Sequence, residues 1–510
     1  MKHTILITAS LLAIFACGKD PGTHPGGNND NPGDTEEPEL PVDPPVDPSA
    51  VCIDTPLMIF SNGKPTVGTG KITVEDASGK VVDMIDLSDM QYVTTASDGV
   101  MLPKEKIGDT TPYNTFMDIL RCGGSQKRIV HYTPIRVTDM GLEVHLHSAV
   151  LDFDKVYTFK AEAGVIQGMT EPYSLQFKTK PKPASKTQLN VNPDGSGDFC
   201  TVQGAITYSY SLGKSAAVTI NIAPATYPEM LYIRDRENLT LKGTAHRATC
   251  IIAYTNCEKY EGGSGGNTTS GPTVGNPIGK SGGRGLVLVE NCNNLALENL
   301  TIRNEVGQND GQAETIYFNS GSNAHRLTIE NCELWSWQDT FLTKGIVWVH
   351  NSTIAGHCDY IWGYPKACLF EDCEIRSLAK GYIVQARVQS ASDKGFVFLN
   401  CTLTAGSGAA DGSMYLARAN DHSKEEENKK TYDNVTYINC TMSPVIANAG
   451  WLASPAPNPG SPTATSGWKE YGSKDASGNA IDTGLRSRCG KVLTAGEAAA
   501  YSSREVVLGF

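Results

Sequence analysis

Gln338-Asp339-Thr340-Phe341 and Asp359-Tyr360-Ile361-Trp362-Gly363 stand at the centre of a repeating sequence, with their aspartates 20 residues apart (359 − 339). Around them an Asn/Asp–Cys/Ser pair, followed by a polar and an aliphatic residue, recurs in steps of about one or two such intervals. The pairs are Asn291-Cys292, Asn331-Cys332, Asn351-Ser352, Asp372-Cys373, Asn400-Cys401 and Asn439-Cys440. A period near 20 residues with short β-rich runs is typical of a stacked solenoid.

The period also predicts chemistry at the two aspartates. Strands of adjacent coils stack about 4.8 Å apart, so Asp339 and Asp359 are expected to be neighbours across one coil step. Two carboxyl groups that close resist ionising together, and one keeps a proton while the other stays charged. The pair would then provide a nucleophile or base beside an acid. Two solvated aspartates at coil turns are the alternative interpretation.

The N-terminus has the pattern of an export signal. Lys2 precedes an apolar run, Ile5–Phe15, that is much shorter than the ~20 residues of a membrane-spanning helix. The end of the run resembles a bacterial lipoprotein signal, with Ile14-Phe15-Ala16-Cys17 as the lipobox. The resemblance implies that residues 1–17 are the signal and that Cys17 carries a lipid. The protein is then exported and anchored to the bacterial cell envelope, at the outer membrane; ordinary export without a lipid is the alternative.

Two further segments precede the repeats. Residues 18–50 are rich in Pro, Gly, Asn, Asp and Glu, and are expected to form a disordered tether. Residues 51–180 contain alternating runs such as Lys71–Glu75, Arg128–Tyr132 and Val156–Lys160, which predict a β-sandwich of roughly a hundred residues. This module resembles the bacterial Ig-like modules that precede catalytic domains in exported glycan-degrading enzymes. A spacer role is expected, with glycan binding as the alternative.

Composition restricts the function of the remaining part, residues 186–510. The length of 510 residues is ample for two folded domains and a tether, and the net charge of −12 gives no basic surface for nucleic acid. No zinc site, phosphate loop, dinucleotide fingerprint or serine elbow can be assembled from the sequence. We therefore expect no metal, no cofactor and a monomer. A stacked internal ladder of small apolar groups is predicted for Cys292, Cys332, Cys373, Cys401 and Cys440.

Six phrases within residues 186–510 resemble those of pectin methylesterases in order and spacing. They are Asp194-Gly195-Ser196-Gly197, Tyr227-Pro228-Glu229, Gln312-Ala313, Gln338-Asp339-Thr340, Asp359-Tyr360-Ile361-Trp362-Gly363 and Tyr415-Leu416-Ala417-Arg418. The resemblance runs nearly to the C-terminus and implies a right-handed parallel β-helix with a shallow groove along one face. The expected fold is therefore all-β, with a β-helix catalytic domain behind a small Ig-like sandwich.

The same resemblance implies roles for individual residues. Asp359 would be the nucleophile, Asp339 the acid and then the base, Gln312 and Gln338 the oxyanion donors, and Arg418 the partner that orients Asp359. These groups suit ester hydrolysis, which needs a nucleophile, donors for the developing oxyanion and a proton for the departing alcohol. The implied substrate is methyl-esterified pectin (homogalacturonan). Residues expected to bind it are Tyr227, Glu229, Trp337, Tyr360 and Trp362, with core packing as the competing account of the aromatic side chains near the two aspartates.

The chain departs from the family pattern at Asn420, which stands where the family has a Trp after its Gly-Arg-Pro, and this puts substrate preference in doubt. The Gly-rich run Glu261–Gly285 is expected to be a loop that flanks the groove. Two other classes stay open from sequence. One is a β-helix polygalacturonase or lyase, although the Asn-Thr-Asp and Gly-His-Gly phrases of the former are absent; the other is a non-catalytic glycan-binding solenoid.

Overall fold

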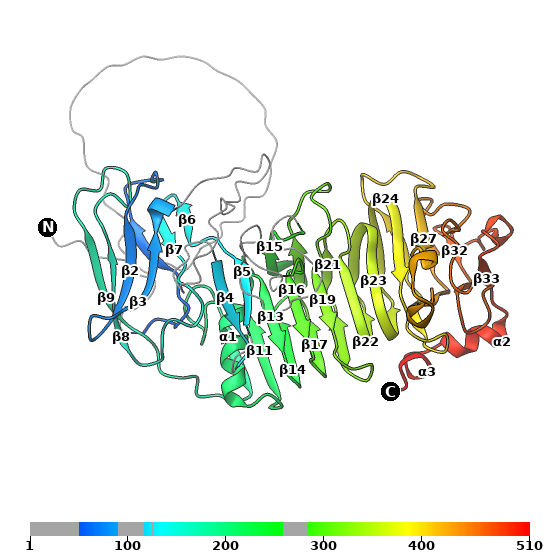
Figure 1. The fold of residues 1–510 in the computed structure, drawn as a ribbon, viewed down its shortest axis with the longest axis horizontal. Coiled ribbons are helices and arrows are strands. Elements are labelled where there is room, and N and C mark those ends of the chain that lie inside the picture. Colours follow the sequence, from blue (N-terminus) through cyan, green and yellow to red (C-terminus); the bar gives the residue numbers. More distant parts are fainter. Residues whose placement is uncertain (1–49, 90–116, 124–126, 259–282) are drawn as a thin grey trace, which may run out of the picture.

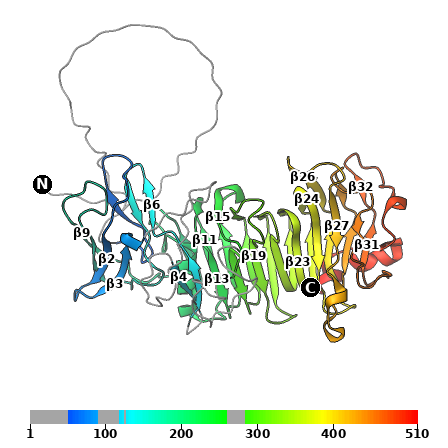
Figure 2. The same ribbon diagram turned by 45° about the horizontal axis from the view of Figure 1, so that its top comes forward.

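The computed structural model describes residues 50–89, 117–123, 127–258 and 283–510. The predicted signal, Cys17, the tether and most of the Gly-rich run therefore lie outside the described residues. The rest forms an elongated all-β molecule, with a small antiparallel part at one end of a long parallel β-helix (Figures 1 and 2). The predicted fold class is confirmed at this level. No helix among the described segments is long and apolar enough to cross a membrane.

The antiparallel part is a sandwich of two sheets. One has the order β1-β7-β6 and the other the order β3-β2-β8-β9. Alternate side chains of both sheets meet in a single buried cluster that includes Leu57, Val74, Leu142 and Phe159. The strands are β1 (Leu57–Phe60), β2 (Lys71–Asp76), β3 (Val81–Asp86), β6 (Ile135–Thr138), β7 (Gly141–Val144), β8 (Val156–Ala161) and β9 (Tyr173–Lys178).

A hairpin of β4 (Met117–Arg121) and β5 (Lys127–His131) does not belong to this sandwich, which corrects the assignment of residues 128–132. Its side chains Leu120, Cys122 and Val130 pack against outward-facing residues of the β-helix instead. The hairpin lies beside β13 in both ribbon views (Figures 1 and 2). Strand alternation predicts a strand but not its partner, because both surfaces offer an apolar face.

The β-helix is a sheet of 24 strands from β10 to β33, whose neighbours in successive coils pair in parallel. Phe341 pairs with Ile361 and Leu334 pairs with Ile354, so one coil here is 20 residues. Inward side chains of all coils form one continuous core. The early strands are β10 (Gln188–Val191), β11 (Val218–Ile222), β12 (Ala225–Tyr227), β13 (Leu231–Arg234), β14 (Leu239–Gly243), β15 (Cys250–Tyr254), β16 (Val287–Glu290), β17 (Leu295–Glu298), β18 (Thr301–Asn304), β19 (Ile316–Asn319), β20 (Arg326–Glu330) and β21 (Glu333–Trp335).

Three strands after these, β22, β23 and β24, are longer and run through more than one face of the helix, and the strands that follow them are short. The structure ends with two short helices, α2 (Ala495–Ala498) and α3 (Arg504–Leu508). The later strands are β22 (Phe341–His350), β23 (Thr353–Glu371), β24 (Glu374–Ala386), β25 (Gly395–Leu399), β26 (Thr402–Ala405), β27 (Met414–Arg418), β28 (Val435–Ile438), β29 (Thr441–Met442), β30 (Trp451–Leu452), β31 (Trp468–Tyr471), β32 (Lys474–Asp475) and β33 (Gly490–Val492).

The repeated Asn/Asp residues are corner residues with positive φ. Asn331, Asn351, Asp372, Asn400 and Asn439 have φ between 46° and 55°, a left-handed conformation that Asn and Asp tolerate better than most residues. The residue after each corner points inward and is buried. The repeat in the sequence is therefore the mark of a turn.

Four of the five predicted ladder cysteines occupy this inward position, and Cys292 does not. Glu298 pairs with Glu330, so the residue stacked on Cys332 in the preceding coil is Leu300. Cys292 instead follows β16, whose Glu290 pairs with Asn319, and so belongs to another row of the coil. Cys292 is buried at a different corner of the coil. A shared Asn-Cys pair indicates a turn but does not tell which of the several turns in a coil it is. The confirmed stack comprises Cys332, Cys373, Cys401 and Cys440, with Ser352 between the first two.

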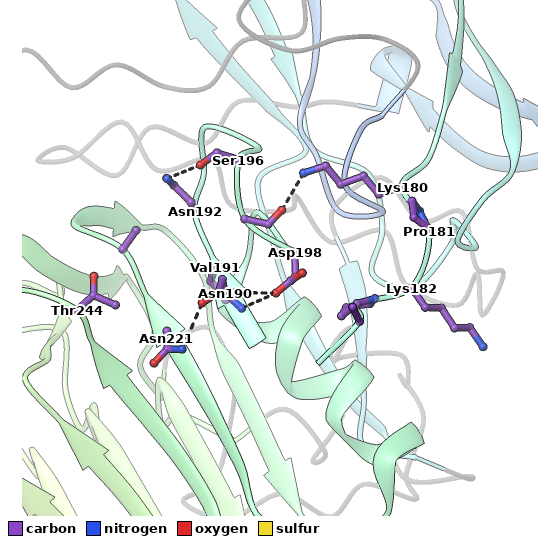
Figure 3. A pocket seen from close by; sticks show the side chains of 14 residues that line it. Lys180, Pro181, Lys182, Asn190, Val191, Asn192, Ser196, Asp198, Asn221 and Thr244 are labelled. Atoms are coloured by element: carbon purple, nitrogen blue, oxygen red, sulfur yellow. Dashed lines mark hydrogen bonds between the residues drawn. The ribbon is translucent and has the colours of Figure 1, made fainter. Parts of the chain in front are cut away.

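Helix α1 (Val202–Ser209) packs on the first coil and is joined to the sandwich. Asp54 of the sandwich accepts hydrogen bonds from the backbone N–H of Cys200 and Thr201, at 2.9 and 2.8 Å, next to the start of α1. Beside this junction lies a hollow of about 540 Å³, where Nζ of Lys180 donates to the Gly197 carbonyl at 2.8 Å (Figure 3). The hollow adjoins the first strands of the β-helix, away from the two aspartates.

Candidate active site

The two aspartates stack on consecutive coils. Gln312 pairs with Gln338, and Gln338 pairs with Cys358, in a parallel ladder, so Asp339 and Asp359 are the next residues of adjacent rows. Both have positive φ, 63° and 47°. In a regular strand Gln338 and Asp339 would point to opposite faces. The left-handed conformation of Asp339 bends the chain after Gln338, so the alternation of a regular strand does not apply to this pair.

Asp359 is held by an arginine of its own. Arg418, the last residue of β27, donates from Nε to Oδ1 at 2.7 Å and from Nη2 to Oδ2. Gln385 of β24 donates to Oδ2 at 3.0 Å, and its own oxygen accepts from Nε of Arg387 at 2.8 Å. The Asp359 side chain is 6% exposed and Arg418 is 29% exposed. The carboxylate is therefore fixed by several donors and one dedicated positive charge.

Asp339 shares its arginine with another acid. Nη2 of Arg284 lies 2.9 Å from Oδ2 of Asp339, while Nε of the same guanidinium contacts both oxygens of Glu314, at 2.9 and 3.0 Å. Nη1 of Arg284 donates to the side-chain oxygen of Gln312. All three charged side chains are nearly closed to solvent, with at most 5% exposure. One positive charge thus faces two buried carboxyl groups.

The glutamines have amide groups available for a ligand. Because the Gln312 oxygen accepts from Arg284, its NH₂ group is directed to donate elsewhere. The Gln338 side chain makes no hydrogen bond within the part of the chain that the structure describes, and both residues are partly exposed. Two neutral donors therefore border the buried aspartates.

Burial raises the pKa of Asp339 well above its ordinary value, and the charge of Glu314 raises it further, against the opposing effect of Arg284. Burial also raises the pKa of Asp359, and the hydrogen bonds and charge of Arg418 oppose this shift. The arrangement therefore favours a proton on Asp339 and a charge on Asp359.

Comparison with known proteins shows the family to which the chain belongs. A family model described as "Pectinesterase" matches residues 188–509, more than half of the sequence. The chain belongs to the pectinesterase family. Pectinesterase 31 of Arabidopsis thaliana is 31% identical over 271 residues, which cover 52% of this chain and 77% of the relative. Probable pectinesterase A of Aspergillus flavus is 31% identical over 227 residues, covering 44% of this chain and 64% of the relative. The enzyme class expected from the sequence is thereby confirmed.

Solved structures are also similar to this pectinesterase. Pectin methylesterase PemA from Erwinia chrysanthemi aligns with a TM-score of 0.49 and 22% identity, over 64% of this chain and 98% of that chain. Pectin methylesterase from carrot aligns with a TM-score of 0.49 and 21% identity, over 65% and 95% of the two chains.

Three residues predicted to bind substrate have other contacts in this pectinesterase. Tyr360 is fully buried inside the coil and its hydroxyl meets that of Ser377 at 3.3 Å. Tyr227 is 2% exposed and donates to backbone carbonyls of the first coil. Glu229 accepts hydrogen bonds from the backbone N–H of Val202 and Gln203, both at 2.8 Å, at the start of α1. These three side chains support the fold, because their polar groups are already bound to it.

The two tryptophans differ from each other. Trp362 is 6% exposed and is flanked by Arg387 and Arg284, whose guanidinium carbons lie 5.0 and 5.9 Å from its ring centroid. Its ring packs against two arginines of the site, and its contact with substrate stays a prediction. Trp337 is partly exposed and packs edge-on to His357. It remains the predicted aromatic surface beside Asp339.

Asn420, at the position of the expected Trp, lines a hollow of about 300 Å³ together with Arg387, Lys424 and Lys429. Its side chain donates to Glu425 at 3.1 Å. The ring platform is therefore replaced by a polar wall made partly by the segment after β27.

Sequence reasoning missed Arg284, Glu314, Gln385 and Arg387. Glu314 stands two residues after Gln312, on the same side of an extended chain, and this spacing could have identified it. Arg284 comes from the end of the Gly-rich run, which was expected to be a loop flanking the groove. Metal ligands were not predicted. Among the described residues Cys52, Asp54 and Cys200 have candidate ligand atoms within 4.8 Å of one another, at the α1 junction, but both Asp54 oxygens already accept backbone N–H groups.

Proposed function

We propose that this pectinesterase removes methyl esters from galacturonate units of pectin, with Asp359 as the nucleophile. The observation that carries the proposal is the asymmetry of the two stacked aspartates. Arg418 and Gln385 bind Asp359 at 2.7 and 3.0 Å, while Asp339 shares Arg284 with Glu314. A charged carboxylate beside a carboxylic acid is the pair that ester cleavage requires.

In the first half-reaction Asp359 attacks the ester carbonyl carbon. The carbonyl oxygen gains negative charge, which the amide groups of Gln312 and Gln338 stabilise; such donors are typically worth about 3 kcal/mol each. As the bond to the methoxy group breaks, Asp339 gives its proton to the leaving oxygen, and methanol departs. The product is an acyl group joined to Asp359 and an ionised Asp339.

In the second half-reaction water replaces methanol. Asp339 now accepts a proton from the water as its oxygen attacks the acyl carbon. The bond to Asp359 breaks, its carboxylate is restored beside Arg418, and Asp339 is again protonated. The sugar carboxylic acid leaves the site and gives its proton to the solvent. Arg418 holds Asp359 in one orientation through both steps, because its Nε and Nη2 bind both carboxylate oxygens.

Methanol release from methyl-esterified pectin tests this function. The wild-type protein should release methanol without shortening the chain and without forming unsaturated product. Chain shortening would indicate a polygalacturonase, unsaturated ends would indicate a lyase, and binding without any product would indicate a non-catalytic solenoid. Any of these three results in place of methanol contradicts the proposal.

We also propose that Cys17 anchors the exported protein to the cell envelope through a lipid, on the strength of the sequence Ile14-Phe15-Ala16-Cys17. The composition of residues 18–50 supports a tether between this anchor and the folded part of the chain. The Cys17→Ser variant should move the protein from the detergent-extracted membrane fraction to the soluble fraction. Retention of that variant in the membrane fraction would contradict the anchor.

A further inference from the structure

A second arginine network lies on the Asp339 side of the site. The guanidinium of Arg284 bridges Glu314, Gln312 and Asp339, and each of its three nitrogens has a partner there. Glu314 is fully buried, so its carboxylate has no access to water as an alternative partner. A buried ion pair of this kind is weak evidence for stability, because the cost of removing the charges from water offsets their attraction.

We propose that Glu314 and Arg284 are a positioning pair, which directs the Gln312 amide toward the oxyanion and keeps the acid proton on Asp339. This inference rests on the proposed function. Both oxygens of Glu314 bind Nε of Arg284, and the Gln312 oxygen binds Nη1. Only Nη2 is left for Asp339. The negative charge of Glu314 therefore offsets much of the positive charge with which Arg284 would stabilise an ionised Asp339.

Four charged groups act on the Asp339 carboxyl, and they act in opposite directions. Glu314 and Asp359 disfavour its ionisation, whereas Arg284 and Arg387 favour it. Glu258 lies 3.6 Å from Nη1 of Arg284 but is 52% exposed, so water screens it. Substitution of Glu314 can therefore change the proton equilibrium of the Asp339 carboxyl while Asp359 and Arg418 stay unaltered.

The backbone that carries Arg284 is fixed by the N-terminal hairpin. Arg128 of β5 is fully buried and donates to the carbonyls of Gly283 at 2.9 Å and Gly285. Asn256 donates to the same two carbonyls, at 3.0 and 3.3 Å. The residues on both sides of Arg284 are thus held, as a positioning residue requires.

The Glu314→Gln variant tests the pair by removing one charge with little change of shape. Arg284 would then be available to Asp339, whose carboxylate is stabilised and loses its proton at lower pH. We expect the basic limb of kcat/KM for methanol release to move down by roughly one pH unit or more. The conservative variant Glu314→Asp, which keeps the charge, should restore the limb at least partly. A matched control is Glu298→Gln, which removes a surface charge paired with Lys242.

Three outcomes overturn the inference. They are a Glu314→Gln profile that superimposes on the wild type, a uniform loss at all pH values without movement of the limb, and a control variant that moves equally. A thermal melting curve checks that each variant is folded. Should the wild type release no methanol, the proposed function fails, and the pairing is then tested by ¹³C NMR titration of the Asp339 carboxyl, assigned with Asp339→Asn. An unchanged Asp339 titration in Glu314→Gln overturns the pairing independently of activity.

Discussion

Asp339 and Asp359 have similar backbones and burial but different neighbours. Both follow a ladder residue, both have positive φ and both side chains are at most 6% exposed. Arg418 serves Asp359 alone with two nitrogens, whereas Arg284 serves Asp339 with one nitrogen and Glu314 with another. The β-helix thus supplies two similar positions, and the surrounding side chains decide which becomes the charged partner and which the acid.

The largest expected effect is that of Asp359→Asn. The amide keeps the shape and the corner but is a far weaker nucleophile, so methanol release should fall by about 10⁴-fold or more. Initial rates on methyl-esterified pectin measure it. Asp372→Asn, at an exposed corner of the helix, is the control and should keep wild-type activity. Full activity in Asp359→Asn would remove the basis for distinguishing the two aspartates.

Arg418→Met should have the second-largest effect on methanol release. The variant leaves Asp359 buried without its positive partner, which raises the pKa of that carboxyl further. Since Asp359 must be ionised to attack, the acidic limb of kcat/KM should move to higher pH, with a loss of about 10²–10³-fold near neutral pH. The pH profile is the measurement. A loss with an unmoved acidic limb would show that Arg418 does not set the charge of Asp359.

A smaller loss of activity is expected when one of the two glutamines beside the aspartates is replaced. Gln338→Ala removes one oxyanion donor and should lower kcat by about 10²-fold, with KM little changed. Gln188→Ala, on the exposed edge of the first strand, provides the matched control. An increase of KM alone would mean that Gln338 binds the substrate in its ground state and is not an oxyanion donor.

The smallest effect on turnover is expected from the hairpin. Arg128→Lys cannot reproduce the bonds of Arg128 to four backbone carbonyls, so the free energy of unfolding should fall by about 3 kcal/mol, as measured in urea. Activity should fall by less than about tenfold, through the Asp339 side only. Arg136→Lys serves as control, because Arg136 lies in β6 of the sandwich, outside the hairpin, and its side chain is half-exposed. Equal stability of the two variants would show that the hairpin does not brace the site.

Much of this arrangement could be predicted from the sequence, because short phrases and the length of one coil carry the information. The 20-residue step predicted the stacking of Asp339 on Asp359, because a coil of fixed length sets the register. The phrase around Arg418 predicted the partner of Asp359. Arg284 could not be found in this way, since it lies at the end of a Gly-rich run without any period. The directions of Tyr360 and Glu229 were also beyond the sequence, because a left-handed corner or a helix end decides where such side chains point.

The left-handed backbone at Asp339 and Asp359 has a consequence for mutational libraries. An L-residue with an ordinary side chain costs about 1 kcal/mol or more in that conformation, whereas Asp, Asn and Gly adopt it more easily. Alanine at either position therefore removes a carboxyl group and also strains the corner, so its lost activity overstates the chemical contribution. A selection for folded variants at these two sites should be enriched in Asn and Gly, even though neither can replace the reactive group.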